Sequence, residues 1–378
     1  MEKSQKTSWI PLILVAAATF VFALDATFMN VSISQLVVDL DTDVATIRKI
    51  ISFYTLITAS LMMISSKLQD IIGKRTIFLL GTIIYGIGSL VAAISPNALI
   101  LFLDWALLEG IGGALMSPTV SSIISGTYDG TRRTTALAVV GAIAGIAAAV
   151  GPIFGGVCTT YFSWRYGFAF ELIVIAVVVI AYRKIPYFAK ITSLKDLDIT
   201  GSVLSAAGLL LLILGILQLS DSNMKLCLIL IIASVIVLLA FGVFEIRRSK
   251  AGKVPLFDVT LLKDRNLTIG TMLRMIAALA MAGSMFAVSI YLQSVLKMSA
   301  IETGLMLITM TAGMLLVSLL APKVSMKLGR KYSMILGFAV AIVGCRTPST
   351  LTRRCSWTMK HSGPMRIITC ERWDTWIP

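Results

Sequence analysis

Residues 10–35 read IPLILVAAATFVFALDATFMNVSISQ, an apolar stretch in which Asp25 is the only charged residue. A helix needs about 20 mostly apolar residues to cross the hydrocarbon core of a bilayer, which is about 30 Å thick. The apolar run is also too long for the core of a cleavable signal peptide. This stretch therefore predicts a membrane-spanning helix near the start of the chain.

The composition of the whole chain agrees with this interpretation. Of its 378 residues, 57% are hydrophobic and only 14% are charged, whereas an ordinary soluble domain has about 25% charged residues. The mean hydropathy is +0.91. So few charges cannot cover a water-facing surface, so the composition excludes a set of soluble domains.

Further apolar stretches of similar length follow along the chain. We expect spans at 50–66, 77–95, 98–120, 135–157, 166–183, 200–219, 225–245, 267–292 and 301–321, and the start of another near Tyr332. The predicted fold class is therefore all-α, a polytopic helical bundle in a lipid bilayer.

The distribution of Lys and Arg predicts the orientation. With the N-terminus in the cytoplasm, the outside loops contain few basic residues, namely Arg48, Lys49, Arg165, Lys225 and Lys297. The cytoplasmic segments then hold most of the others, which explains the net charge of +14 without a nucleic-acid partner. The five cysteines form no CxxC pair and His361 is the only histidine, so we expect neither a metal site nor a disulfide framework.

A weak internal repeat divides the chain. Residues 66–75 (SKLQDIIGKR) and 322–331 (PKVSMKLGRK) each place a glycine before two basic residues. Such a repeat predicts two related halves. We expect an N-terminal six-helix bundle (1–184), a linker with an inserted two-helix hairpin (185–266), an incomplete C-terminal bundle (267–345) and an aberrant polar tail (346–378).

Four motifs carry a resemblance to a known family. They are SKLQDIIGKR at 66–75, LDATFMNV at 24–31, AAAVGPIFGG at 147–156 and SWRYGF at 163–168. In this order they are similar to motifs of the major facilitator superfamily, in particular the fourteen-helix drug:proton antiporters. The resemblance runs from about residue 9 to about residue 345. It implies about 11 of the expected 14 helices, with a truncation or frame shift near residue 345.

The resemblance also implies a function. It predicts a multi-pass protein of the inner or plasma membrane that exports small amphipathic or cationic compounds in exchange for protons, acting as a monomer without a cofactor. Three alternatives remain open: a facilitator or symporter of a polar metabolite, an inactive truncated member, and an enzyme. The enzyme is the weakest, because no GxxxxGK[ST], HExxH or GxSxG motif is present. A regulatory tail is the alternative to the frame shift.

One departure from the family affects the proton chemistry. In the family, the fourth helix carries R-x-x-Q-G-x-G, and its arginine is implicated in proton coupling. Residues 106–112 here read ALLEGIG, so the arginine is missing and Glu109 replaces the glutamine. In the 66–75 motif, Ser66 and Ile71 also depart from the family pattern. Proton coupling in this chain is therefore expected to depend on other residues.

Acidic residues inside predicted spans are the candidates for this role. A charge at a helix centre costs about 2.5–3.5 kcal/mol on insertion scales, so it usually has a function. A carboxyl group in such surroundings resists ionising, which suits a proton carrier. The proton-coupling candidates are Asp25, Glu109 and Glu171. The alternative is a structural carboxyl bonded to a neighbouring helix. Asp104 is expected near the interface, and Arg274 as a counter-ion or a snorkelling side chain.

A second set of residues is expected to control conformational change. Asp70 could latch the helix that follows it, and the small residues around Pro152 permit close, bendable helix contacts. The alternatives are headgroup anchoring for the basic residues and plain packing for the glycines. We expect Trp164 and Arg165 to be interfacial anchors, and the substrate-binding residues are unknown. The gating candidates are Asp70, Gly73, Lys74, Arg75, Gly151, Pro152, Gly155 and Gly156.

Overall fold

The structure is a computed structural model that describes residues 8–192, 198–220, 224–292 and 329–351, with isolated residues between 306 and 328 and the pairs 356–357 and 370–371. The chain forms two compact units, residues 1–318 and 319–378. Helices make up nearly all of the described part, which confirms the all-α fold class. The exception is a two-residue antiparallel pair, β1 (Ser356–Trp357) and β2 (Cys370–Glu371).

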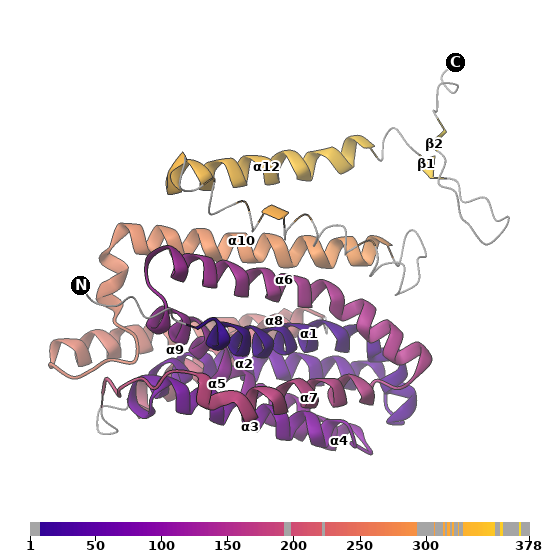
Figure 1. Cartoon of the computed structure of the whole chain (residues 1–378), viewed down its shortest axis with the longest axis horizontal. Coiled ribbons are helices and arrows are strands. Elements are labelled where there is room, and N and C mark those ends of the chain that lie inside the picture. The colour runs from indigo at the N-terminus through magenta and orange to yellow at the C-terminus, as the bar shows by residue number, and fades with distance from the viewer. Residues whose placement is uncertain are drawn as a thin grey trace. The chain divides into compact units, whose positions relative to one another are not determined.

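The helices of the first unit follow the apolar stretches of the sequence (Figure 1). They are α1 (Ile10–Asp39), α2 (Val44–Ile72), α3 (Lys74–Ala92), α4 (Ala98–Leu101), the π-helix η1 (Phe102–Glu109), α5 (Gly110–Thr127), α6 (Gly130–Tyr161), α7 (Arg165–Ala181), the 3₁₀ turn η2 (Tyr182–Lys184), α8 (Ile199–Ser220), α9 (Met224–Lys250), the 3₁₀ turn η4 (Val259–Lys263) and α10 (Arg265–Ile290). The second unit contains α12 (Arg330–Leu351).

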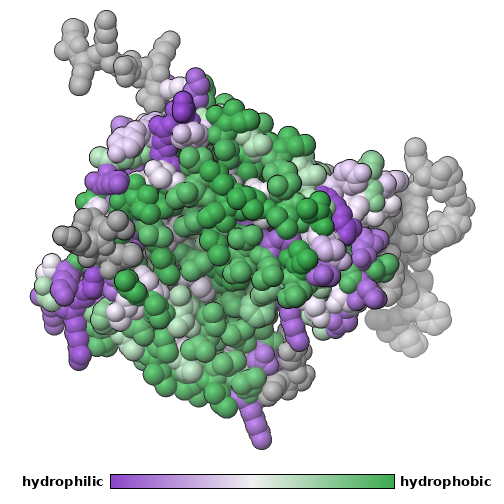
Figure 2. All heavy atoms as spheres, turned by 90° about the horizontal axis from the view of Figure 1, so that it is seen from below, coloured by the Kyte–Doolittle hydropathy of each residue, from purple (hydrophilic) through white to green (hydrophobic). Residues whose placement is uncertain are grey.

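Within the described residues, eight helices are long and apolar enough to cross a membrane, from Ile10–Asp39 to Met224–Lys250. They coincide with the first eight expected spans, because α4, η1 and α5 together form one span, Ala98–Thr127. The ninth expected span, 267–292, coincides with the helix α10, which is not among these eight. The expected span 301–321 lies mostly outside the described residues. Figure 2 shows one face on which hydrophobic side chains form a broad continuous area with hydrophilic residues towards its ends.

The helices of the first unit pack through close contacts at small residues. α1 packs on α6, α3 packs on α5 and α7, and α2 packs on α5. At Gly112 of α5, an added Cβ would lie 2.5 Å from the backbone nitrogen of Tyr85 on α3. Small residues let helix backbones approach this closely, which stabilises helix pairs in lipid.

The hairpin of α8 and α9 is joined at its base by polar contacts. α8 and α9 pack on each other, and α8 packs on α2. Asp198 precedes α8 and accepts a hydrogen bond from the Gly201 N–H at 2.8 Å, and its other oxygen lies 3.1 Å from Arg248 Nε. Glu245 on α9 accepts from the Phe257 N–H at 3.3 Å. These contacts fix the ends of the two helices to the segment that follows α9.

The contact between α1 and α6 gives a stability prediction. A Cβ at Gly155 would lie 2.8 Å from the backbone oxygen of Phe28, whereas a Cβ at Gly141 of the same helix would have open space around it. Overpacking a tight contact typically costs about 1–3 kcal/mol. We therefore expect Gly155→Val to lower the melting temperature in detergent clearly more than Gly141→Val does. Equal melting temperatures for the two variants would contradict this packing.

Candidate proton-coupling site

Three acidic side chains from three helices converge inside the first unit. They are Asp25 of α1, Glu109 at the end of η1 and Glu171 of α7, here called the carboxylate triad. All three are fully buried. One carboxylate oxygen of each lies within 4.8 Å of the others. The structure therefore brings together all three residues that the sequence predicts as proton-coupling candidates.

Each carboxyl group of the triad accepts hydrogen bonds from a neighbouring side chain. Trp105 Nε1 donates to both oxygens of Asp25, at 2.9 and 3.0 Å. The Ser89 hydroxyl donates to Glu109 Oε1 at 3.1 Å, and the Tyr85 hydroxyl donates to Glu171 Oε2 at 3.4 Å. Asp25 thus differs from the two glutamates, because one indole N–H bonds both of its oxygens.

Aromatic rings enclose the site. The ring of Tyr54 stacks on Trp105, with centroids 4.8 Å apart and planes 7° apart. Phe168 meets Trp105 edge-on at 6.5 Å. These rings and the complete burial of the three acids exclude bulk water. Such surroundings have a low effective dielectric, in which an uncompensated charge is costly.

The charge of the triad is not balanced by a basic side chain in the described part of the chain. The two ion pairs found there join Asp39 to Arg165 and Asp198 to Arg248. Two full negative charges 4.8 Å apart repel by about 3.5 kcal/mol at an effective dielectric of about 20. Three ionised carboxylates would add three such repulsions, or roughly 10 kcal/mol, to the cost of burial. Simultaneous ionisation of all three carboxyl groups is therefore costly in this site.

The π-helical turn of η1 positions two members of the site. Trp105 lies within η1 and Glu109 ends it, so both side chains reach the triad from one widened segment. π-helical turns inside α-helices occur frequently at functional sites. Gly88 of α3 faces this segment, and a Cβ there would lie 2.9 Å from the backbone nitrogen of Glu109. The absence of a side chain at Gly88 lets α3 bring Ser89 to Glu109.

Sequence reasoning assigned no role to the side chains that surround the triad, namely Tyr54, Tyr85, Ser89 and Trp105. A signal for two of them was present, because Tyr85 and Ser89 are polar residues spaced i, i+4 on an apolar helix, which places them on one face. Trp105 has the same spacing from Glu109. The stacking of Tyr54 on Trp105 joins two helices and has no local signal.

Two other charged residues of the predicted spans, Asp104 and Arg274, lie outside the triad. Asp104 was expected near the membrane interface; it is buried within the protein, only 2% exposed, and its depth in the membrane stays a prediction. It accepts hydrogen bonds from the Ser95 hydroxyl at 3.0 Å and the Trp105 backbone N–H at 2.6 Å. These two donors satisfy its carboxylate inside the protein. Arg274 lies exposed on α10 and forms no ion pair with a described residue.

The predicted gating loop forms the junction of α2 and α3. Gly73 has φ 110°, a conformation that favours glycine, and its N–H donates to the Gln69 carbonyl at 3.0 Å. The carbonyl of Asp70 accepts from the Ile191 and Thr192 N–H groups, at 2.8 and 3.2 Å. This contact joins the loop to the segment after η2 through the backbone, and the carboxylate of Asp70 has no ion pair within the described residues.

The two basic residues of this loop contact other parts of the protein. Lys74 Nζ donates to the Ser122 carbonyl at 3.5 Å and lies 5.3 Å from the centre of the Phe188 ring. The guanidinium of Arg75 lies 4.9 Å from the centre of the Tyr182 ring. Both side chains therefore connect the start of α3 to residues of other segments, and their role in gating stays a prediction.

The glycine-rich motif of α6 lies against α1. A Cβ at Gly151 would overlap Thr27 and lie 3.0 Å from the Leu24 carbonyl, next to Asp25 in the sequence. Gly155 approaches Phe28 in the same way. Pro152 lies inside α6, and Gly156 is buried. The motif therefore packs against the part of α1 that carries Asp25, whereas its role in gating stays a prediction.

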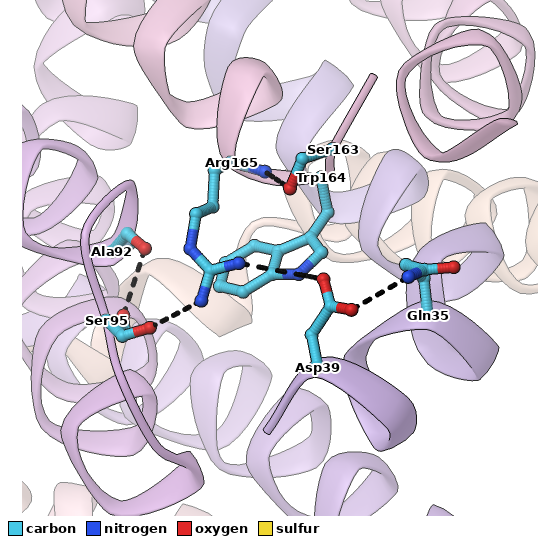
Figure 3. A network of polar contacts seen from close by, with 7 residues as sticks. All are labelled: Gln35, Asp39, Ala92, Ser95, Ser163, Trp164 and Arg165. Atoms are coloured by element: carbon cyan, nitrogen blue, oxygen red, sulfur yellow. Dashed lines mark hydrogen bonds and ion pairs between the residues drawn. The ribbon is translucent and has the colours of Figure 1, made fainter. Parts of the chain in front are cut away.

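A polar network joins the end of α1 to the start of α7 (Figure 3). Asp39 accepts from Trp164 Nε1 at 3.0 Å and from Gln35 Nε2 at 2.8 Å, and it lies 3.6 Å from Arg165 Nη1. Arg165 Nη2 donates to the Ser95 carbonyl at 2.9 Å. The expectation that Trp164 is an interfacial anchor is wrong, since its side chain is fully buried. Both residues connect helices within the protein.

Comparison with known proteins identifies the family. The model of the Major Facilitator Superfamily matches residues 15–345. Because this match covers most of the sequence, the chain belongs to the Major Facilitator Superfamily. It is therefore a multi-pass membrane transporter by family, in agreement with its apolar helices.

Individual relatives are more distant. The lincomycin resistance protein of Streptomyces lincolnensis is 25% identical over 89% of this chain and 69% of its own length. The riboflavin transporter RibZ of Clostridioides difficile (strain 630) is 24% identical over 90% of this chain and 73% of its own length. Other relatives are covered over 63% to 75% of their length. The chain thus spans about two thirds to three quarters of these proteins.

A solved structure supports the fold alone. The proton:xylose symporter XylE, bound to 6-bromo-6-deoxy-D-glucose, superposes with a TM-score of 0.53. Its sequence is 16% identical, and the match covers 85% of this chain and 70% of that structure.

Proposed function

We propose that this protein exports small amphipathic or cationic compounds across the cell membrane in exchange for protons. The observation that carries the proposal is the convergence of three fully buried carboxyl groups within 4.8 Å. A site with this surplus of acid and no basic partner among the described residues attracts positive charge. Protons and a cationic substrate would then compete for it, which is the requirement for antiport.

The relatives favour this class of substrate. The lincomycin resistance protein is named for resistance to a drug, and its match covers 89% of this chain. In the proposed cycle, a proton neutralises the triad when the site opens to the more acidic side. Departure of that proton to the cytoplasm restores a negative charge, which favours binding of the next cation. The triad is thereby charged in one orientation and neutral in the other.

The proposal includes the orientation of the protein in the membrane and the helix contacts that change during transport. The N-terminus lies in the cytoplasm, because the basic residues gather in the segments on that side. The junction around Gly73 and the contact of Gly151 and Gly155 with α1 would carry the change between the two orientations. The protein would work as a monomer in the inner or plasma membrane. Protons, its small substrate and the lipid bilayer are its only expected partners.

A second function is favoured by one observation. The relative RibZ is named a riboflavin transporter, and riboflavin is a polar metabolite rather than a lipophilic cation. In this alternative the protein moves such a metabolite as a facilitator or symporter, and the triad is a structural element. An inactive member of the family is the remaining alternative.

The two functions are separated by transport into proteoliposomes that contain the full chain. With an acidic interior, we expect the fluorescent cation ethidium to accumulate while protons leave, and we expect both fluxes to stop when the gradient is collapsed with a protonophore. Riboflavin should produce neither flux. Protein-free liposomes correct for passive entry of ethidium.

Three results would contradict proton-coupled export of cations. Riboflavin uptake without ethidium uptake would favour the polar-metabolite function. Ethidium uptake that persists without a gradient would rule out proton coupling, and movement of neither compound would favour an inactive member.

A further inference from the structure

Two oxygen atoms of the carboxylate triad have no hydrogen-bond partner. They are Glu109 Oε2 and Glu171 Oε1, and both are buried. The other oxygen of each glutamate accepts a bond, from Ser89 and Tyr85 respectively. Asp25 differs, because both of its oxygens accept from the same indole N–H. Buried polar atoms in native proteins almost always have a partner, so the two free oxygens require an explanation.

One proton on each free oxygen supplies that explanation. An ionised carboxylate only accepts hydrogen bonds, whereas a protonated carboxyl group also has one O–H donor. A proton on Glu109 Oε2 and another on Glu171 Oε1 would turn both atoms into donors, in a site where one oxygen of each acid lies within 4.8 Å of the others. The same two protons leave the site with one negative charge, which lies on the aspartate.

Within the described residues, no positively charged side chain near the triad compensates its negative charge. The remaining titratable groups that face it are the hydroxyls of Tyr54 on α2 and Tyr85 on α3. α5 has no charged residue, and those of α6, Arg132 and Arg133, are in its first turn. Tyr54 is 4% exposed and its hydroxyl is also unpartnered, so this side chain is neutral and adds no positive charge to the site.

The donors around the triad favour protons over a metal ion. Trp105, Ser89 and Tyr85 each direct the positive end of an N–H or O–H bond at a carboxylate oxygen. A metal ion bound to these oxygens would compete with the three donors for the same lone pairs. Protonated glutamates leave all three bonds in place.

We infer that Glu109 and Glu171 each keep a resident proton and act as hydrogen-bond donors, whereas Asp25 alone carries the exchangeable proton. This inference rests on the proposed function, and it names which carboxyl group of that site exchanges with the substrate. Glu109 and Glu171 are then positioning residues that hold Asp25 and limit the site to one charge. Since glutamine resembles a protonated glutamate in shape and donor capacity, it should replace either residue without loss of coupling.

Infrared spectroscopy of the full chain in lipid tests the inference without transport. Protonated carboxyl groups absorb separately from carboxylates, and the contributing residues are identified by substitution. At pH 7 we expect Glu109→Gln and Glu171→Gln each to remove one protonated carboxyl band, and Asp25→Asn to remove none. Acidification should add a band to the spectrum of the wild-type chain that is missing from Asp25→Asn. Thermal melting checks that each variant is folded.

The same variants have a second readout in proteoliposomes. We expect Glu109→Gln and Glu171→Gln to slow ethidium uptake but to keep proton release tied to it, whereas Asp25→Asn should abolish the proton release. Loss of coupling in either glutamine variant would overturn the inference even if Asp25 proved essential. The inference would also be overturned if Glu109→Gln or Glu171→Gln left the infrared spectrum unchanged. A protonated carboxyl band that disappears when Na⁺, Mg²⁺ or Ca²⁺ is added would overturn it as well. If the wild-type chain moves no ethidium, the proposed function fails, but the infrared result still decides the protonation of the triad.

Discussion

Replacing Asp25 by Asn is expected to abolish the release of protons driven by substrate. Asparagine has nearly the same shape as aspartate and can still accept a bond from Trp105 Nε1 through its carbonyl oxygen. It cannot bind or lose a proton. In acid-inside proteoliposomes, the proton flux coupled to ethidium should therefore fall to the level of protein-free liposomes. Fluorescent pH indicators follow the flux directly.

The size of this effect follows from the position of Asp25. Its side chain is fully buried, and both oxygens are bonded to one indole. No water-exposed carboxyl group can take over its role within this enclosed site. Loss of its charge also removes the attraction for a cation, so ethidium uptake itself should decrease. A variant that is merely misfolded would instead lose its cooperative melting transition.

The matched control is Asp104→Asn. Asp104 is also buried and also accepts hydrogen bonds, from Ser95 and the Trp105 backbone, but it does not belong to the triad. Coupled flux in this variant should remain close to that of wild type. If Asp25→Asn and Asp104→Asn behaved alike, the triad would have no special role in coupling.

Replacing Trp105 by Phe is expected to shift the pH dependence of transport. Phenylalanine retains an aromatic ring between Tyr54 and Phe168 but lacks the N–H that donates to Asp25. A hydrogen bond to a charged group contributes about 1.5–3 kcal/mol. Its loss destabilises the ionised form of Asp25, so the proton is held more tightly and leaves only at higher pH. Half-maximal coupled flux should therefore move upward by about one to two pH units, since one unit corresponds to about 1.36 kcal/mol.

A second buried tryptophan provides the control for this variant. Trp164 Nε1 donates to Asp39, which lies in the network at the end of α1 (Figure 3). Trp164→Phe also removes an indole donor from an aspartate, so it carries a similar structural cost. It should leave the pH of half-maximal flux unchanged. A shift of the same size in both variants would mean that the indole of Trp105 has no specific effect on Asp25.

The sequence predicted the helical part of the structure well, because hydrophobicity alone decides membrane insertion. The first eight expected spans correspond to the eight apolar helices of the described chain. The three acids of the triad were also predicted, since a charge inside an apolar run is costly and therefore conspicuous. Asp25 has an additional signal in its motif, LDATFMNV at 24–31.

The arrangement of the site could not be predicted in the same way. Glu109 and Glu171 are separated from Asp25 by more than 80 residues, and periodicity within one helix carries no information about contacts between helices. The π-helical turn of η1 alters the positions of Trp105 and Glu109 without a local sequence signal. The burial of Asp104 and Trp164 could not be predicted either, because their partners, Ser95 and Asp39, come from other segments.

In the proposed function, a proton and a cationic substrate compete for the carboxylate triad. The most direct test of this competition is a measurement of proton release when ethidium is added to the purified chain in weakly buffered detergent solution. We expect the wild-type protein to acidify the solution near the pH at which Asp25 is half-protonated, and Asp25→Asn to release nothing. Binding of ethidium without proton release by the wild-type protein, or equal release by both proteins, would contradict the account.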